Sequence, residues 1–511
     1  MNIYTVNYIL SRLSFAMAGA LVIPLVLAIA GDEPSREAFM LSVLVSAFAG
    51  VGFRRYGRRA EELTAREGIA ITAFGWFTGT FLGMLPYLLG NYLGFLDALF
   101  ECISGFTGTG ATVFASLGSL PYSILFWRMM TAWIGGLGII VIFIALLPQS
   151  GASTIYMYNA EGAGPTTDRV MPRLRDMTMA LFKIYLVFTA VTTGIFMLCG
   201  VDFSVAITHA MSTIGTCGFS TYDDSTMHFH SLAFELWTAL FMFLAGGSFS
   251  LYYRAWVKGP SVILRNTEFR TYLSMILIAI LLIALNLIIE MGMDTDMAAR
   301  AAVFQSTSLS TTGFVSADFE TWPTFSKLLL LLLMLIGGCA GSTASGIKVA
   351  RIILLVRNAR AVILQKLNPH RVIDISLGGT HVDSAMLLRV GTFFFLYLAI
   401  IFVTAFLLTM DGLLPFDAVA VAIDGAVAAG CPSRTARRAR AAQIDVTLAM
   451  ATADRSMPAV NMVNMTPRLI RPNSGNWTAM DCQVRTAKNG PDLTMAKNAS
   501  SSTSTRTRRV M

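Results

Sequence analysis

Three short runs rich in threonine, serine and glycine recur along this chain at intervals of about 100 residues. They are FTGTGAT at 106–112, IGTCGFST at 214–221 and LSTTGFVS at 309–316. Each run follows a short amphipathic segment, for which Asp97, Ser204 or Asp296 is a suitable helix-capping residue, and each precedes a long apolar stretch. The chain is therefore expected to repeat one structural unit, and the repeat constrains how every other segment is interpreted.

The composition assigns the chain to a class. Hydrophobic residues make up 55% of its 511 residues and charged residues 13%, about half of what a soluble protein carries. The net charge of +8 is no nucleic-acid footprint, because the basic residues stand at the ends of apolar stretches. The six cysteines have neither paired nor metal-site spacing, and residues 12–30 are too long an apolar stretch for a cleaved signal. We expect an all-α polytopic membrane protein.

The charges between apolar stretches predict a topology. The expected spans are 12–30, 37–53, 69–89, 122–147, 177–199, 232–256, 271–291, 324–356 and 386–410. Basic clusters, such as the one at 53–60, alternate with acidic loops, such as Asp223 and Asp224. Basic loops stay in the cytoplasm, so the N-terminus is predicted to be cytoplasmic. The acidic loops then face outward, where they raise the local cation concentration, unless they are merely solvated loop charges.

The repeated runs have the composition of a cation filter. A short helix that dips into the membrane aims its carbonyl-rich end at the loop that follows. Glycines let such a loop turn its carbonyl oxygens toward a common axis, where they replace the hydration shell of a monovalent cation. The predicted filter residues are Thr107, Gly108, Thr109, Gly110, Ala111, Thr216, Cys217, Gly218, Phe219, Thr311, Thr312, Gly313 and Phe314. Among them, K⁺ is expected at Thr109, Gly110, Thr216, Cys217, Gly218, Thr311, Thr312 and Gly313.

Glycines recur about 25 residues after each filter run, and the third set predicts a gate. Close helix packing is the alternative explanation of these glycines. The third set, within 337–348, is too rich in glycine and hydroxyl groups to form a helix against lipid, so it should line a cavity under the filter. The predicted gate residues are Gly337, Gly338, Cys339, Ala340, Gly341, Ser342, Thr343, Gly346 and Lys348. Lys348 stands at the inner end of this segment, with snorkelling toward the cytoplasm as the simpler alternative.

A fourth unit begins and is not completed. The span 386–410 and a short helix at 418–429, capped by Asp417, are followed at 431–436 by Cys-Pro-Ser-Arg-Thr-Ala, where a filter is due. Residues 431–511 contain no Phe, no Tyr and no apolar run long enough to cross a membrane. We interpret them as a disordered or frame-shifted tail.

Several of these motifs together resemble the Trk/Ktr/HKT superfamily of potassium transporters, and its TrkH branch most closely. They lie at 100–113, 133–140, 160–165, 308–314 and 337–348. The resemblance implies repeated membrane–pore-loop–membrane units around a pseudo-fourfold pore, with the fourth unit incomplete here. It also implies a homodimer in the bacterial cytoplasmic (inner) membrane, a cytosolic nucleotide-binding TrkA-like partner, and a gating loop at 337–346.

The resulting division of the chain follows the repeat. We expect two extra N-terminal spans at 1–60, pore units at 61–176, 177–270 and 271–385, a partial fourth unit at 386–430, and the tail at 431–511. Lipid would surround the units, and no nucleic acid is expected as a partner.

The predicted function is potassium uptake through the carbonyl filter, with K⁺ as the transported ion and no organic cofactor. The alternative is a non-conducting pseudo-subunit or truncated product that lacks the fourth filter. A membrane hydrolase built on His209 is disfavoured, because the five histidines are scattered and no nucleophile–base pair is evident. The sequence leaves open whether transport is passive or a symport with H⁺ or Na⁺. Glu101 is the nearest candidate for a coupling carboxylate, and packing within its helix is the alternative.

Overall fold

The computed structural model describes residues 2–58, 65–136, 138, 174–368, 375–377, 380–410 and 412–427. Within these residues six helical segments are long and apolar enough to cross a membrane. They are formed by α1 (Ile3–Ala30), α2 (Arg36–Arg55), α3 (Ala65–Gly83) with α4 (Leu85–Leu89), α9 (Leu174–Leu198), α14 (Thr267–Met291) and α18 (Ser384–Met410). These agree with six of the predicted spans. The expected fourth filter and the tail at 431–511 lie outside the described residues.

Each filter run follows a short helix, as the sequence predicts. These helices are α5 (Phe95–Thr107), α10 (Phe203–Gly215) and α15 (Thr295–Thr311), and α19 (Pro415–Val427) is the corresponding helix after α18. We call α5, α10 and α15 the pore helices. The predicted capping residues are wrong by up to three positions, because the caps are Gly94, Asp202 and Asp294. Asp97 and Asp296 instead lie in the first turn, where a carboxylate favours the helix dipole.

The helices after the second and third filter runs are shorter than predicted. The expected span 232–256 is two helices, α11 (Leu232–Ala245) and α12 (Phe249–Lys258), with an angle of 89° between them. The expected span 324–356 is likewise α16 (Thr324–Ile336) and α17 (Val349–Leu367), and α6 (Tyr122–Gly136) ends where 137 and 139–147 pass outside the described residues. Both α11 and α16 stop at the predicted glycine sets, because two neighbouring glycines weaken a helix where other contacts offer the chain a different path.

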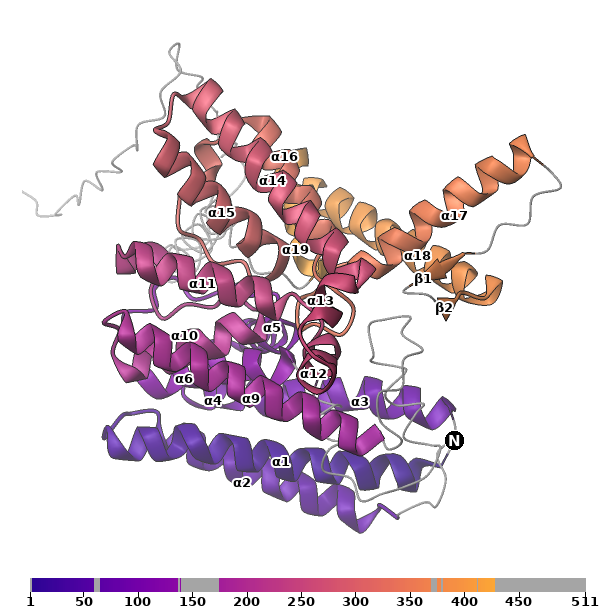
Figure 1. Cartoon of the computed structure of the whole chain (residues 1–511). Helices are drawn as coiled ribbons and strands as arrows, with labels where there is room; N and C mark the ends of the chain where they lie inside the picture. The colour runs from indigo at the N-terminus through magenta and orange to yellow at the C-terminus, as the bar shows by residue number, and fades with distance from the viewer. Residues whose placement is uncertain are drawn as a thin grey trace, which may run out of the picture. The chain divides into compact units, whose positions relative to one another are not determined.

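The units repeat one packing pattern (Figure 1). An outer helix packs on a pore helix in the pairs α9 with α10 and α14 with α15, and an inner helix packs on one in the pairs α5 with α6 and α15 with α16. Adjacent units meet where α10 packs on α6 and where α15 packs on α11, while the α1–α2 hairpin packs on α3 and α6. The remaining elements are short: η1 (Ser225–Phe229), α13 (Ser261–Arg265), η2 (Phe319–Thr321), and strands β1 (Ser376–Leu377) and β2 (Thr380–His381), which pair antiparallel.

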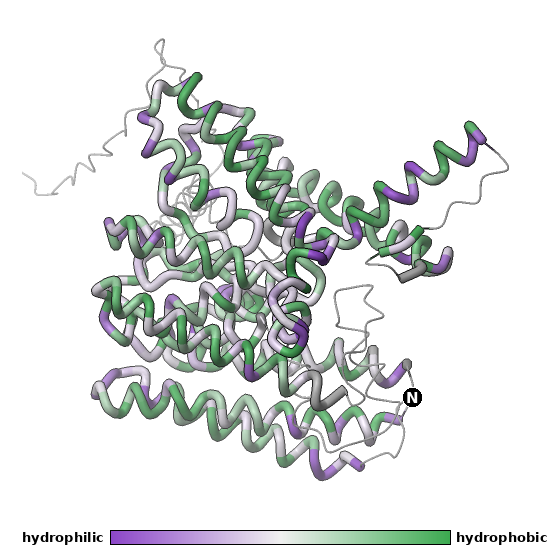
Figure 2. The backbone as a smooth tube through the Cα atoms, viewed as in Figure 1, coloured by the Kyte–Doolittle hydropathy of each residue, from purple (hydrophilic) through white to green (hydrophobic). Residues whose placement is uncertain are grey.

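The helix surfaces have the polarity that a membrane requires. Figure 2 shows long hydrophobic stretches on α1, α14 and α18, with polar residues gathered near helix ends. Large apolar side chains face outward, among them Phe48 and Leu198, which are 79% and 87% exposed. Inside, α10 and α15 bury several serine and threonine side chains beside apolar residues. An apolar exterior around hydroxyl-rich pore helices is the arrangement of a polytopic membrane protein.

Candidate functional site

The three predicted filter loops share one backbone feature. The glycines at equivalent places in the runs, Gly110, Gly218 and Gly313, all have positive φ, at 74°, 81° and 98°. Residues with a side chain rarely adopt this conformation. In the first two loops another left-handed residue, Gly108 or Thr216, ends the pore helix, whereas α15 continues one residue closer to its glycine. The first two loops therefore leave their helices by the same kind of turn, and the third shares with them only the positive φ of its glycine.

Serines of the pore helices hold the far side of two filter loops. Ser104 Oγ donates to Ala111 O at 2.5 Å, and Ser308 Oγ donates to Phe314 O at 2.6 Å. These two carbonyl groups are directed at the pore helix that precedes them. Among the predicted filter residues, Ala111 and Phe314 therefore use their carbonyl groups to hold the loop against its own helix. Carbonyl groups that could face a cation would come from earlier residues of the same loops.

A buried ion pair joins the first two filter loops. Arg128 of α6 donates through Nε to Glu101 Oε1 of α5 at 2.5 Å, and the two side chains are 2% and 0% exposed. Arg128 Nη1 also donates to Ser220 O at 3.0 Å, and its guanidinium lies 3.6 Å from the centroid of the Phe219 ring. Glu101 in turn accepts from the loop that contains Gly110, as described below. The structure thus brings the first and second runs together.

Uncharged groups connect the second and third loops. Thr226 Oγ1 of η1 donates to Val315 O at 2.9 Å, and Val315 N donates to Ser225 Oγ at 3.2 Å. The ring of His209 lies against that of Phe314, with 6.0 Å between centroids. His209 Nε2 is 3.1 Å from Ser220 Oγ, and its Nδ1 lies 2.9 Å from Val205 O. The His209 ring is therefore occupied in holding the loops, with no acidic residue on its second nitrogen, unlike a hydrolase base.

The predicted gate segment is a closed loop between α16 and α17. Its two ends pair with each other, since Lys348 N donates to Ile336 O at 2.9 Å and Val349 N donates to Gly338 O at 3.1 Å. Gly337 has a φ of 75°, and a Cβ there would lie 1.9 Å from Ser345 O. A glycine is required at this position, so the turn depends on the composition that the sequence analysis singled out.

Backbone contacts attach the gate loop to the break between α11 and α12. Cys339 N donates to Gly246 O at 2.8 Å, and Phe249 N donates to Gly341 O at 3.1 Å. Glu268, in the first turn of α14, accepts from Ala340 N at 2.5 Å. The gate loop of the third unit thus packs on the break between α11 and α12 in the second unit. The sequence analysis did not predict this contact.

Thr343 places the gate loop next to the second filter. Its Oγ1 donates to Ile214 O at 3.0 Å and lies 3.3 Å from Ala245 O. Ile214 belongs to the last turn of α10, two residues before Thr216 of the filter run. The loop therefore lies against the carbonyl end of a pore helix, where the predicted gate is expected.

Lys348 does not snorkel. Its side chain is buried, with the residue 4% exposed, and Nζ donates to Ala344 O and lies 3.4 Å from Ser342 Oγ. The ammonium group therefore binds inside the gate loop, and the simpler alternative is wrong for this structure.

The glycines after the filters also provide close packing. A Cβ on Gly135 would lie 1.9 Å from Phe106 O, and one on Gly246 would lie 2.4 Å from Thr311 Cγ2. Gly136 is packed in the same way on Gly215. Close packing, the alternative explanation of these glycines, therefore holds at Gly135, Gly136 and Gly246, and the gate at the third set stays a prediction.

Arg128 and Glu268 are the contributing residues that sequence reasoning missed. An arginine within an apolar stretch is costly unless it is paired, so Arg128 in the sequence SILFWRMMTAW was a detectable signal. Its partners lie 27 and 92 residues away, at Glu101 and Ser220, and no local pattern connects them.

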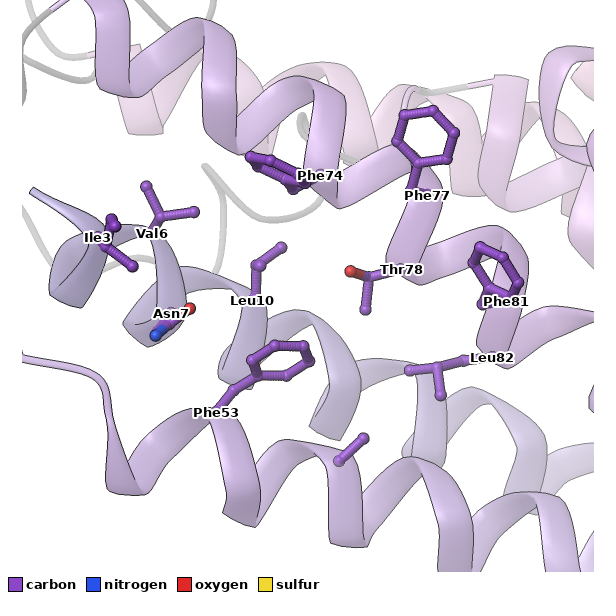
Figure 3. A pocket seen from close by; sticks show the side chains of 11 residues that line it. Ile3, Val6, Asn7, Leu10, Phe53, Phe74, Phe77, Thr78, Phe81 and Leu82 are labelled. Atoms are coloured by element: carbon purple, nitrogen blue, oxygen red, sulfur yellow. The ribbon is translucent and has the colours of Figure 1, made fainter. Parts of the chain in front are cut away.

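A separate cavity of about 530 Å³ lies between α1, α2 and α3 (Figure 3). It is lined by Ile3, Val6, Asn7, Leu10, Ala49, Phe53, Phe74, Phe77, Thr78, Phe81 and Leu82. The lining is mostly apolar and contains no predicted filter or gate residue.

The described residues include no cluster of His, Cys, Asp or Glu that suits a bound metal.

Comparison with known proteins gives a consistent result. A family model described as TrkH, cation transport protein, matches residues 35–429. The chain is 34% identical to the Trk system potassium uptake protein TrkH of Vibrio parahaemolyticus over 432 residues, which cover 82% of this chain and 88% of that protein. It is 32% identical to TrkH of Escherichia coli K12, with the same coverage. The crystal structure of the potassium transporter TrkH from Vibrio parahaemolyticus superposes with a TM-score of 0.74 and 31% identity, covering 83% of this chain and 89% of that one.

Proposed function

The chain belongs to the TrkH family of cation transport proteins, and from this premise we propose that it takes up K⁺ through a filter formed by residues 107–110, 216–218 and 311–313. The observation that supports the filter most directly is the positive φ shared by Gly110, Gly218 and Gly313. Each follows the C-terminal end of a pore helix, where the partial negative charge attracts a cation. Carbonyl groups presented by such turns replace water around K⁺.

The loop at 337–348 closes this path below the second filter. Three features support this role. The loop is not helical, and it is hydrogen-bonded to the break between α11 and α12. The hydroxyl group of Thr343 donates a hydrogen bond to Ile214 O. Its attachments are mostly single hydrogen bonds, each worth about 0.5–1.5 kcal/mol, so a modest force from the cytoplasmic side can release it.

The family places this chain among multi-pass membrane subunits of Trk systems. We propose that it forms a homodimer in the inner membrane with its N-terminus in the cytoplasm, where a TrkA-like nucleotide-binding subunit moves α17 and thereby the gate loop. The second candidate, a non-conducting pseudo-subunit, is motivated by the sequence at 431–436, which lacks the composition of a filter.

Ion flux into proteoliposomes separates these possibilities. We expect the purified chain to take up Rb⁺ or K⁺ in preference to Na⁺, and Gly313→Ser to reduce that preference by forcing a side chain into a φ of 98°. Gly259→Ser is the matched control, because Gly259 has a φ of 96° at the end of α12 and open space around it. Its strain is similar, and its preference should match that of the unaltered chain.

A folded Gly313→Ser protein with unchanged preference contradicts the filter. An unaltered chain that folds, dimerises and passes no ion favours the pseudo-subunit.

A further inference from the structure

The ion pair between Glu101 and Arg128 is in contact with two filter loops at once. We propose that Glu101 and Arg128 are positioning residues that fix the first and second filter loops relative to each other and thereby set the preference for K⁺ over Na⁺. This inference rests on the proposed filter and adds to it the side chains that determine its selectivity.

Glu101 holds the first loop just beyond its glycine. Its Oε1 accepts from Thr112 Oγ1 at 3.0 Å, and its Oε2 accepts from Val113 N at 2.9 Å. With the Arg128 bond, three donors converge on one carboxylate in the interior of the protein. A carboxylate in that position is held in one place, and the chain leaving Gly110 is held with it.

Arg128 holds the second loop at the matching place. Its bond to Ser220 O and its contact with the Phe219 ring both fall within two residues of Gly218. An arginine makes these contacts together because its planar group donates at the edge while its face stacks on an aromatic ring. The pair therefore spans from the residues after Gly110 to the residues after Gly218.

Burial gives this connection its stiffness. Both side chains are within 2% of full burial, so neither charge has water as an alternative partner. Separating the two side chains would leave two buried charges without partners, which is costly. The pair therefore stays in contact in the folded state. A filter discriminates between K⁺ and Na⁺ through the spacing and field of its carbonyl groups, and loops that shift independently lose that discrimination. The same contacts argue against Glu101 as a coupling carboxylate, because both of its oxygens are already engaged.

Ion-dependent stability of the full-length chain tests the inference without requiring conduction. The melting temperature is measured in KCl and in NaCl over a concentration series, since an ion that binds the folded state stabilises it. We expect the unaltered protein to bind K⁺ in preference to Na⁺, and Glu101→Gln to reduce the ratio of the two apparent affinities by about tenfold. Glu235→Gln is the control: Glu235 pairs with Arg300 of α15 at 2.6 Å without contacting a filter loop, so the ratio should be unchanged.

Each outcome decides a different point. If the unaltered protein shows no K⁺ preference, the proposed filter fails and the inference fails with it. If that preference exists and Glu101→Gln retains it, the inference alone is overturned. Should Glu101→Gln not fold, Thr112→Val removes one arm of the connection and leaves the ion pair; a reduced ratio supports the inference, and an unchanged ratio rejects it. A purely structural role predicts a lower melting temperature in both salts with the ratio intact.

Discussion

The contact between the first and second filter loops differs in kind from the contact between the second and third. Glu101 and Arg128 join the first two loops through a fully buried ion pair. Ser225, Thr226 and backbone groups join the second and third, and the gate loop lies on that side, against Ile214 and Gly246. Breaking the buried pair costs about 3–5 kcal/mol, whereas a neutral hydrogen bond contributes about 0.5–1.5 kcal/mol. The contact between the first two loops is thus the more costly one to break, and the weaker contact lies on the side of the proposed gate.

The largest effect should come from Arg128. Arg128→Leu leaves Glu101 buried without its counter-ion, so we expect the free energy of unfolding to fall by about 3–5 kcal/mol. Arg300→Leu breaks the ion pair with Glu235, but the Arg300 side chain is 40% exposed and water reaches the pair, so its loss should be about 1 kcal/mol. Thermal unfolding of the two purified variants measures the difference. Equal losses would show that burial does not distinguish the two ion pairs.

The next effect concerns the close approach of inner and pore helices. Gly135→Ala puts a Cβ 1.9 Å from Phe106 O, a backbone atom that cannot rotate away, so we expect a loss of about 1–3 kcal/mol. Gly194→Ala is the matched control, since Gly194 lies inside α9 with nothing within 4 Å of its added Cβ. That variant should be neutral or more stable by up to about 1 kcal/mol. A stable Gly135→Ala protein would mean that α6 can move away from α5.

The gate side of the comparison is tested by Thr343. Thr343→Val removes the hydroxyl that binds Ile214 O while keeping the shape of the side chain, and Thr343→Ser keeps the hydroxyl. We expect the valine variant to raise K⁺ flux into proteoliposomes by about tenfold, which corresponds to about 1.4 kcal/mol between closed and open loop. The serine variant should behave as the unaltered chain. A folded valine variant with unchanged or lower flux would contradict the gate.

The sequence predicts the parts of this architecture that recur or that violate a local rule. The pore helices follow from the repeat, and the interruption after Ile336 follows from a composition that no lipid-facing helix tolerates. The break after Ala245 was missed, because Gly246 and Gly247 within an apolar stretch are equally compatible with an unbroken, closely packed helix.

The contacts of Arg128 with Glu101 and Ser220 could not be predicted from the sequence for a different reason. Glu101 was noticed for its charge and Arg128 was not, yet the role of each depends on the other and on Ser220, which belongs to another unit. Only the folded chain brings these three residues together. The assignment of residues 107–111, 216–219 and 311–314 to an ion filter stays a prediction. The interpretation of 431–511 stays a prediction as well.

The smallest expected effect tests whether the second and third loops are held as weakly as their neutral contacts suggest. Thr226 is buried, and its hydroxyl donates to Val315 O, two residues beyond Gly313. Thr226→Val preserves the volume and leaves that carbonyl without its donor, so we expect a loss of about 1 kcal/mol in the free energy of unfolding. Thr271→Val is the control, since its hydroxyl donates to Thr267 O on the exposed face of α14 and its loss should be close to zero. A loss at Thr226 as large as that at Arg128 would remove the contrast between the two contacts, because the third loop would then be held as firmly as the first two.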